Sequence, residues 1–144
     1  MKININYLKD LHFTAEARHF KDIHIDEPES FHGTNSGPSS VEYLLIGIGG
    51  CLASTLAHCL NKNLVPINKL DIIVDGRLKH TGPSNRLRLI EIFVEILVST
   101  ENTHQKALDS CIRSFQEFCP IAHALTNGIP VNVNVSKKKH QIRT

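Results

Sequence analysis

The longest apolar pattern in the chain runs from Pro38 to Asn61 and has the spacing of a helix. Ser39 and Glu42 stand at its start as a capping box, in which the serine hydroxyl accepts from a first-turn amide and the carboxylate accepts from the amide of the cap residue. The pattern predicts a helix that is too short, and too polar at Glu42 and His58, to span a membrane. The residues on its apolar face are Val41, Leu44, Leu45, Ile48, Leu52, Thr55, Leu56, Cys59 and Leu60.

A second stripe on the same helix is made mostly of small residues, Gly47, Cys51 and Ser54, followed by His58. Glycine inside a helix costs about 1 kcal/mol relative to alanine. The glycines at positions 47, 49 and 50 therefore predict that another part of the protein packs closely against the helix backbone. We expect this helix to lie at the centre of the fold.

Period-two alternation predicts strands on both sides of the helix. Three strands precede it, near residues 2–8, 13–17 and 23–25, and a loop rich in Pro, Gly, Ser and Asn covers 27–38. Two strands follow, over 70–78 and 87–98 around a turn at 81–85, and the second is expected to place Ile90, Ile92, Val94, Ile96 and Val98 on one face. An amphipathic helix over 102–118, a short helix from Pro120 to about Thr126 and a strand over 131–135 complete the chain. The apolar face predicted for the helix over 102–118 contains Ala107, Leu108, Cys111, Ile112, Phe115 and Phe118. The order βββ-α-ββ-αα-β predicts one α+β domain over residues 1–144, with antiparallel sheets.

The composition and net charge of the chain limit the classes of protein to which it can belong. The chain of 144 residues is 41% hydrophobic and 21% charged, as in soluble globular proteins. The first ten residues carry no export pattern, which favours the cytoplasm and predicts four cysteines in the thiol form. The net charge of +2 argues against a strongly charged partner such as a nucleic acid. The basic tail, Lys137–Lys139 with Arg143, is most simply a solvated end, and phosphate contact through it is a weaker alternative.

The four cysteines fall into two pairs, Cys51 with Cys59 on the first helix and Cys111 with Cys119 at the second, where Cys119 directly follows its predicted end. Eight residues on a helix rotate by about 80°, which is not the spacing of a zinc site, so we expect no metal. Cys59 and Cys111 lie on apolar faces and are expected to be small core residues. Cys119 would cap the third helix, where free amides lower a thiol pKa. Cys51 lies in mid-helix and would need a nearby cation to become a thiolate.

The segments GPSSVEYLLIGIGGCLA and FCPIAHAL, whose cysteines Cys51 and Cys119 are 68 residues apart, resemble the OsmC/Ohr family of thiol-dependent hydroperoxide reductases and their OsmC-like relatives. The order of elements is similar over nearly the whole chain. The resemblance implies an intertwined homodimer in which sheets of both subunits wrap around two central helices. It also implies that Cys51 is the peroxidatic cysteine and Cys119 the resolving one. No bound cofactor is implied, but a dithiol must regenerate the enzyme.

In the family, organic hydroperoxide reductases activate the cysteine with an arginine and with a glutamate ten residues before it. That position is Val41 here, and Glu42 is nine residues before Cys51, half a turn out of phase. Glu42 is therefore as well explained by the capping box as by activation. Arg18 is the candidate for the arginine, in a segment (17–20) that matches only loosely. His58 and His123 lie nearest to the cysteines in sequence, and we assign them no role.

The leading hypothesis is a dimeric, cytoplasmic peroxidase of oxidative stress defence that reduces an organic hydroperoxide or H₂O₂. Cys51 would attack and Cys119 resolve, with Arg18 and Glu42 as candidate activators, and the apolar surroundings of Cys51 favour an organic substrate. The alternative is an OsmC-like binding or structural protein whose cysteines are poorly activated. Val41 at the activating position favours that alternative.

Overall fold

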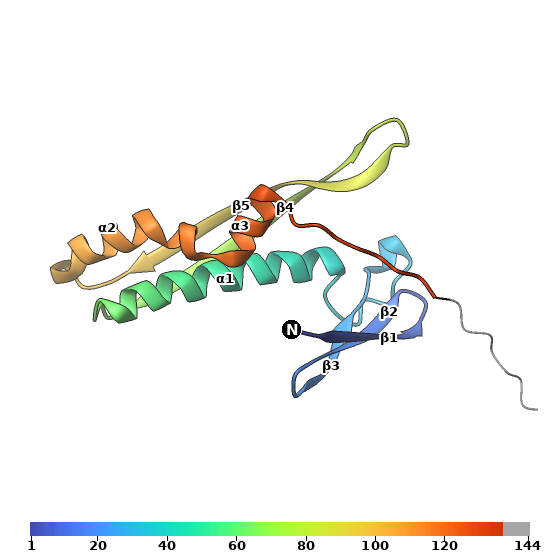
Figure 1. Cartoon of the computed structure of the whole chain (residues 1–144), viewed down its shortest axis with the longest axis horizontal. Coiled ribbons are helices and arrows are strands. Elements are labelled where there is room, and N and C mark those ends of the chain that lie inside the picture. The colour runs from blue at the N-terminus through green and yellow to red at the C-terminus, as the bar shows by residue number, and fades with distance from the viewer. Residues whose placement is uncertain (137–144) are drawn as a thin grey trace, which may run out of the picture.

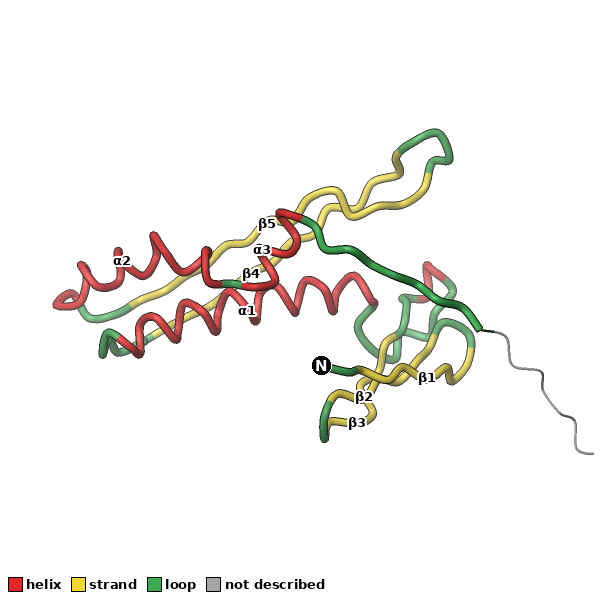
Figure 2. The backbone as a smooth tube through the Cα atoms, in the orientation of Figure 1, coloured by secondary structure: helices red, strands yellow, loops and turns green. Residues whose placement is uncertain are grey.

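The computed structural model describes residues 1–136 and has the predicted α+β architecture (Figure 1). A three-stranded antiparallel sheet lies beyond the N-terminal end of a long helix, and an antiparallel two-stranded hairpin runs alongside that helix (Figure 2). The basic tail from Lys137 onward lies outside the described residues. The strands are β1 (Ile3–Lys9), β2 (His12–Ala17), β3 (Phe20–Ile25), β4 (Lys69–Thr81) and β5 (Arg86–Ser99). The helices are α1 (Ser40–Lys62), α2 (Gln105–Ser114) and α3 (Pro120–Asn127), with 3-10 turns at η1 (Glu29–Phe31), η2 (Asn102–His104) and η3 (Phe115–Phe118).

Helix α1 begins at the predicted capping box. The Ser39 amide donates to Glu42 Oε2 over 2.6 Å, and the Glu42 amide donates to Ser39 Oγ over 3.3 Å. The helix contacts β4, β5, α2, η3 and α3, so the prediction of a central helix is confirmed. Its buried side chains are Ile48, Leu52, Leu56 and Leu60.

By length and composition alone, α1 is able to cross a membrane, with a mean hydropathy of 1.6 over an 18-residue window. The prediction that this segment is too short and too polar to do so is therefore wrong. In this fold the same apolar face contributes Leu56 and Leu60, both essentially inaccessible to solvent, to the core. A core helix and a membrane span share this composition, and 28% of the window is buried in the single chain.

Two of the three helix glycines explain how closely other elements approach α1. A Cβ built on Gly49 would lie 2.8 Å from Val74 Cγ2 on β4, and one on Gly47 would lie 3.9 Å from Ile121 Cδ1. A Cβ on Gly50 would meet nothing within 4 Å. Close packing is thus confirmed at Gly49, whereas Gly50 faces open space in the single chain.

Asp26 fixes the loop that leads into α1. Its carboxylate is buried and accepts hydrogen bonds from the Thr34 hydroxyl at 2.6 Å, the Ser36 amide at 3.0 Å and the Glu27 amide at 2.9 Å. Burial by itself would raise the pKa of Asp26, but these hydrogen bonds outweigh it and hold the pKa well below its usual range. The ionised form therefore closes the loop just before the N-cap of α1.

The β4–β5 hairpin departs from strict alternation at one bulge. Arg77 pairs with Glu91 and Leu78 with Leu89, so Ile90 has no partner. Ile92, Val94, Ile96 and Val98 keep the half-buried face as predicted, but Ile90 is exposed, and Leu89 takes the half-buried position in its place. The prediction for Ile90 is wrong because one extra residue inverts the faces of a strand.

The predicted helix over 102–118 is divided into η2, α2 and η3. Leu108, Cys111 and Phe115 are buried, but Ile112 is 43% exposed and Phe118 70% exposed, contrary to the predicted common face. The change to a 3-10 turn at Phe115 shifts the angular spacing of the side chains, which turns Phe118 away from the core.

The predicted last strand does not form in the single chain. Residues 128–136 contain no helix or strand, and Val131, Val133 and Val135 are each about 80% exposed. Figure 2 shows this segment running away from the helices after α3. An alternating sequence becomes a strand only when another strand supplies its hydrogen bonds, and the described chain supplies none here.

The close contact at Gly49 yields a stability prediction. Gly49→Ala should lower the free energy of unfolding by about 1–3 kcal/mol, because the new methyl group forces Val74 to move. Gly47→Ala is the matched control. It should leave stability unchanged or raise it by up to about 1 kcal/mol through helix propensity. Urea unfolding followed by circular dichroism measures both, and a gain of stability in both variants would contradict the close contact.

Candidate functional site

The structure brings together two cysteines that are far apart in the sequence. Cys51 lies in the middle of α1 and Cys119 between η3 and α3. Their Sγ atoms are 2.8 Å apart, with the Cys119 thiol donating to Cys51. Both are free thiols; Cys119 is buried and Cys51 is half-buried. The pair can therefore form a disulfide with little backbone movement.

Cys119 is held in place by the start of α3. It is the N-cap of this helix, Pro120 occupies the first position, and Cys119 Sγ accepts from the Ala122 amide at 3.4 Å. The predicted capping position is confirmed, but its predicted effect is not. Burial and the hydrogen bond to Cys51 raise the pKa of Cys119, and they outweigh the lowering by the Ala122 amide. Cys119 is thus a protonated donor toward Cys51 at neutral pH.

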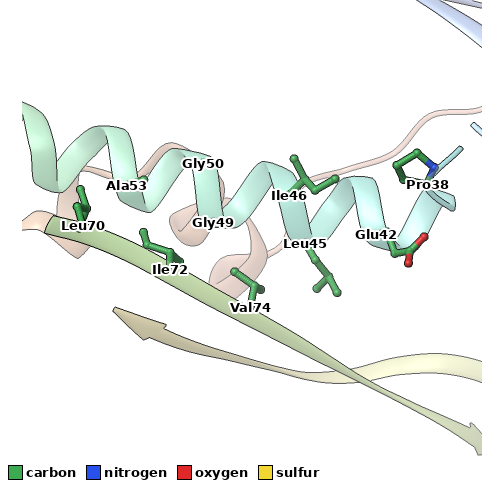
Figure 3. Close-up of a pocket in the computed structure, with 10 residues that line it drawn as sticks. All are labelled: Pro38, Glu42, Leu45, Ile46, Gly49, Gly50, Ala53, Leu70, Ile72 and Val74. Carbon is green, nitrogen blue, oxygen red and sulfur yellow. The ribbon is translucent and has the colours of Figure 1, made fainter. Parts of the chain in front are cut away.

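Glu42 is not brought to the cysteines. The Ser39 amide donates to the Glu42 carboxylate, and this hydrogen bond is the largest cause of the lowered pKa of Glu42. Cys51 lies about 13 Å further along the helix axis. Glu42 instead lines an open groove of about 730 Å³ between α1 and β4 (Figure 3). The groove is lined by Pro38, Glu42, Leu45, Ile46, Gly49, Gly50, Ala53, Leu70, Ile72 and Val74.

Arg18 also lies away from the cysteines in the single chain. It occupies the turn between β2 and β3 with a left-handed φ of 57°, and its guanidinium carbon is 5.2 Å from the centre of the Phe20 ring. The sheet that carries it lies beyond the N-terminal end of α1 (Figure 1). Within this chain, Arg18 therefore makes an exposed cation–π contact.

Charged groups near the thiol pair are few. In residues 1–136, no lysine, arginine or histidine side chain forms a hydrogen bond with Cys51 or Cys119, and the His58 and His123 side chains are exposed. The described part of the chain also contains no group of three His, Cys, Asp or Glu side chains arranged to hold a metal ion. Among the described residues, the hydrogen-bond partner of the Cys51 sulfur is therefore Cys119.

Cys59 and Cys111 form a disulfide between α1 and α2, with Cα atoms 5.8 Å apart. The prediction that both are core residues holds, because Cys111 is fully buried and Cys59 packs against the same core. The prediction that they are thiols is wrong. The sequence did contain a signal for the pairing. Both segments carry cysteines eight residues apart, and two segments that run antiparallel with similar spacings bring the members together pairwise.

Comparison with known proteins assigns the fold to a family. The sequence profile described as OsmC-like protein matches residues 33–134. The chain belongs to the OsmC-like protein family. No curated protein matches the sequence.

Solved structures of OsmC-like proteins share this fold. An OsmC-like protein from Mycoplasma pneumoniae is 24% identical, with 94% of each chain covered and a TM-score of 0.73. An organic hydroperoxide resistance protein OsmC from Legionella pneumophila is 14% identical, with 86% of this chain and 87% of that chain covered and a TM-score of 0.60. The organic hydroperoxide resistance protein OhrB of Bacillus subtilis is 17% identical, with 88% and 90% covered and a TM-score of 0.59. At these identities the likeness establishes the fold.

The raised pKa of Cys119 is directly measurable in this OsmC-like protein. In Cys51→Ser, with the Cys59–Cys111 disulfide intact, Cys119 is the only free thiol and its ionisation raises the absorbance near 240 nm. We expect the midpoint to lie above that of an unfolded cysteine, because burial is the largest cause of the shift and persists in the variant. The same titration of Cys51→Ser/Cys119→Ser, which has no free thiol, gives the absorbance change that comes from tyrosine ionisation, and this change is subtracted. A midpoint below the unfolded value would contradict this electrostatic description.

Proposed function

We propose that this OsmC-like protein is a thiol-dependent peroxidase that reduces organic hydroperoxides or H₂O₂. The observation that carries the proposal is the contact between the Cys51 and Cys119 thiols, at 2.8 Å. Two similar folds belong to organic hydroperoxide resistance proteins, from Legionella pneumophila and Bacillus subtilis, which supports the same chemistry here.

The contact also favours one order of events. Cys51 is the more exposed of the two sulfurs and accepts the hydrogen bond, whereas Cys119 is buried and donates it. The Cys51 thiolate attacks the terminal oxygen of ROOH and breaks the O–O bond. The leaving RO⁻ takes a proton and departs as ROH, and Cys51 becomes a sulfenic acid. Two electrons thus pass from the sulfur to the peroxide.

Cys119 then completes the oxidative half of the cycle. Its sulfur attacks the Cys51 sulfenic acid, the S–O bond breaks, and the hydroxyl group leaves as water with the Cys119 proton. The product is a Cys51–Cys119 disulfide. An external dithiol returns both thiols by two exchange steps and is itself oxidised to a disulfide. We place the cycle in the cytoplasm as part of oxidative stress defence, because that compartment supplies dithiol reductants.

The surroundings of Cys51 favour an organic substrate. Cys51 packs against the cluster that contains Ile48 and Leu52, and these apolar neighbours offer no hydrogen bonds to a small polar peroxide. An alkyl chain would gain from leaving water there. We therefore expect a higher kcat/KM for cumene hydroperoxide than for H₂O₂.

A homodimer would account for the apolar surface of the single chain. The open groove contains Ile46, which is 57% exposed, and Gly50, whose missing side chain leaves space for a neighbouring backbone. The segment with Val131, Val133 and Val135 has the alternation of a strand but no partner strand. A second copy of the chain, seated against α1 and pairing with this segment, would cover both surfaces.

The decisive test of activity is intact-mass analysis and peptide mapping after one equivalent of cumene hydroperoxide. The protein with Cys51 and Cys119 reduced should form a Cys51–Cys119 disulfide stoichiometrically. Cys119→Ser should stop at a Cys51 sulfenic acid that dimedone traps, and Cys51→Ser should lose at least about 99% of turnover, since the attacking sulfur is gone. Slow, unselective oxidation of all thiols would refute the proposal.

Two further variants in this experiment separate activation from structure. Glu42→Gln keeps a side chain that serves a capping box but removes the charge. Arg18→Gln removes the cation. A fall in the rate of Cys51 oxidation, without a fall in stability, would assign either residue to activation.

An alternative function has two observations in its favour. Glu42 is engaged by Ser39, and no cation in residues 1–136 is bonded to Cys51, as expected for an OsmC-like binding protein with poorly activated cysteines. Under that alternative, the rate of Cys51 oxidation would match that of an unstructured thiol. The rate measured above therefore distinguishes the two functions.

The dimer is tested by placing a charge in the groove. We expect the parent protein to elute as a dimer, and Ile46→Lys to raise the dissociation constant about a hundredfold or more, because an unpaired buried charge costs several kcal/mol. Ile112→Lys, at an exposed position of α2, is the control and should leave the dimer intact. Sedimentation velocity over a dilution series measures both. A monomeric parent protein would contradict the proposal.

A further inference from the structure

A second cysteine pair joins α1 to α2 outside the site just described. Cys59 and Cys111 are linked by a disulfide near the C-terminal end of α1, where α2 lies beside it (Figure 1). Cys59 is eight residues from Cys51, which corresponds to about 12 Å along the helix axis. Thiol–disulfide exchange requires direct contact between sulfurs, so this pair does not exchange with Cys51 in the folded chain. It must have a separate role.

The chain connects this disulfide directly to the resolving cysteine. From Cys111 the backbone passes through the last turn of α2 and through η3 and reaches Cys119 eight residues later. Between the two sulfurs, Phe115 is the buried anchor. The segment that presents Cys119 is therefore fixed at one end by the disulfide, in the middle by Phe115 and at the other end by the cap of α3.

Other attachments between α2 and α1 are few. Leu108 and Cys111 of α2 and Phe115 of η3 supply the buried contacts. Among the described residues, the side-chain hydrogen bond to α2 from the end of α1 is the 3.6 Å contact from Nδ2 of Asn63, the C-cap of α1, to Cys111 Sγ. Loss of the disulfide leaves the ten-residue helix α2 attached mainly by its few apolar contacts. Helices of this length are not stable without such attachment.

We infer that Cys59 and Cys111 form a reversible thiol–disulfide site that controls the docking of α2 on α1. Through that docking, the pair sets how fast Cys119 reaches oxidised Cys51. The second statement rests on the proposed peroxidase function, and the first does not. Cys59 and Cys111 are positioning residues in this scheme, since neither touches the peroxide.

The exposure of the two sulfurs defines the exchange chemistry. Cys59 is half-buried, whereas Cys111 is fully buried, so an external thiolate reaches Cys59 Sγ. In reduction, one thiolate of a dithiol attacks Cys59 Sγ, the S–S bond breaks, and Cys111 leaves as a thiolate that takes a proton. The second thiol of the reductant then attacks the mixed disulfide, releases Cys59 and ends as a cyclic disulfide. Asn63 Nδ2 lies 3.6 Å from Cys111 Sγ and is placed to stabilise the leaving thiolate.

Oxidation is the reverse exchange with a small-molecule disulfide such as glutathione disulfide. The Cys59 thiolate attacks one sulfur of the small disulfide, forms a mixed disulfide with it and releases the first small thiol. The Cys111 sulfur then attacks Cys59 Sγ in the mixed disulfide and releases the second small thiol. Two protein thiols and one disulfide thus give a protein disulfide and two small thiols. The redox state of the thiol pool would then decide whether α2 is fixed.

The first test does not depend on peroxidase activity. In Cys51→Ser/Cys119→Ser, only Cys59 and Cys111 exchange. The full chain is equilibrated in glutathione and dithiothreitol buffers and alkylated. Its intact mass then gives the number of free thiols at each buffer composition. We expect a single two-electron transition, and on reduction at least a tenfold faster amide exchange over residues 105–118, with the middle of α1 unchanged. If this variant fails to fold, peptide mapping of the parent protein gives the same titration.

Two results would overturn this first part. A disulfide that resists dithiothreitol until the protein unfolds is not a reversible site. Amide exchange over residues 105–118 that does not change on reduction would show that the disulfide does not control docking.

The second test separates the two steps of peroxide reduction. Cys59→Ser/Cys111→Ala removes the disulfide without placing a hydroxyl in the buried Cys111 site. We expect the second-order rate of Cys51 oxidation to stay within twofold of the parent value, and the first-order rate of Cys51–Cys119 disulfide formation to fall about tenfold or more. Cys51 should also overoxidise to sulfinic acid at lower peroxide doses. Quench-flow followed by intact-mass analysis measures the rate of Cys51 oxidation, the rate of disulfide formation and the extent of overoxidation. Ser110→Ala, at an exposed position of α2, is the control.

Unchanged disulfide formation in this variant would overturn the role in resolution. Failure of Cys51 to form a sulfenic acid even in the parent protein would instead refute the proposed peroxidase function, and with it the resolution role. The buffer titration and the amide exchange would still decide whether the pair is a reversible docking site.

Discussion

Burial of one face of α1 is the interaction on which the described structure depends. Ile48, Leu52, Leu56 and Leu60 lie along this face and meet β4, η3, α2 and α3. Each fully buried aliphatic side chain contributes about 2 kcal/mol, so this one stripe supplies a large share of the marginal stability of a small domain. The elements that carry cysteines are assembled on it, which is why sulfur atoms remote in sequence become neighbours.

The same arrangement explains the two chemically different cysteine pairs. Both pairs join α1 to the segment that runs from α2 to α3, but the sulfur atoms meet in different surroundings. Cys119 is buried at the start of α3 and donates to the half-buried Cys51, whereas Cys59 and Cys111 are already joined. A pair of free thiols and a disulfide are thereby placed between the same two parts of the chain.

The single chain also leaves much of α1 uncovered. The groove beside Gly50 and Ile46 is open, and the final alternating segment has no strand beside it. Arg18 lies on a sheet beyond the end of the helix and Glu42 at its first turn, each engaged in contacts of its own. Activation of Cys51 by either residue would require an approach that this single chain does not contain.

The sequence by itself determined the order of elements up to α3 and the capping box at Ser39 and Glu42, because these depend on local spacing. Through the family motifs it also identified Cys51 and Cys119 as candidates. It could not determine the bulge at Ile90, the exposure of Phe118 or the absence of a strand at 131–135, which depend on what each segment packs against. The raised pKa of Cys119, the contact between the Cys51 and Cys119 sulfurs and the Cys59–Cys111 disulfide also depend on how the chain packs. Desolvation and sulfur–sulfur distance arise only when remote segments meet, so tertiary structure alone decided them.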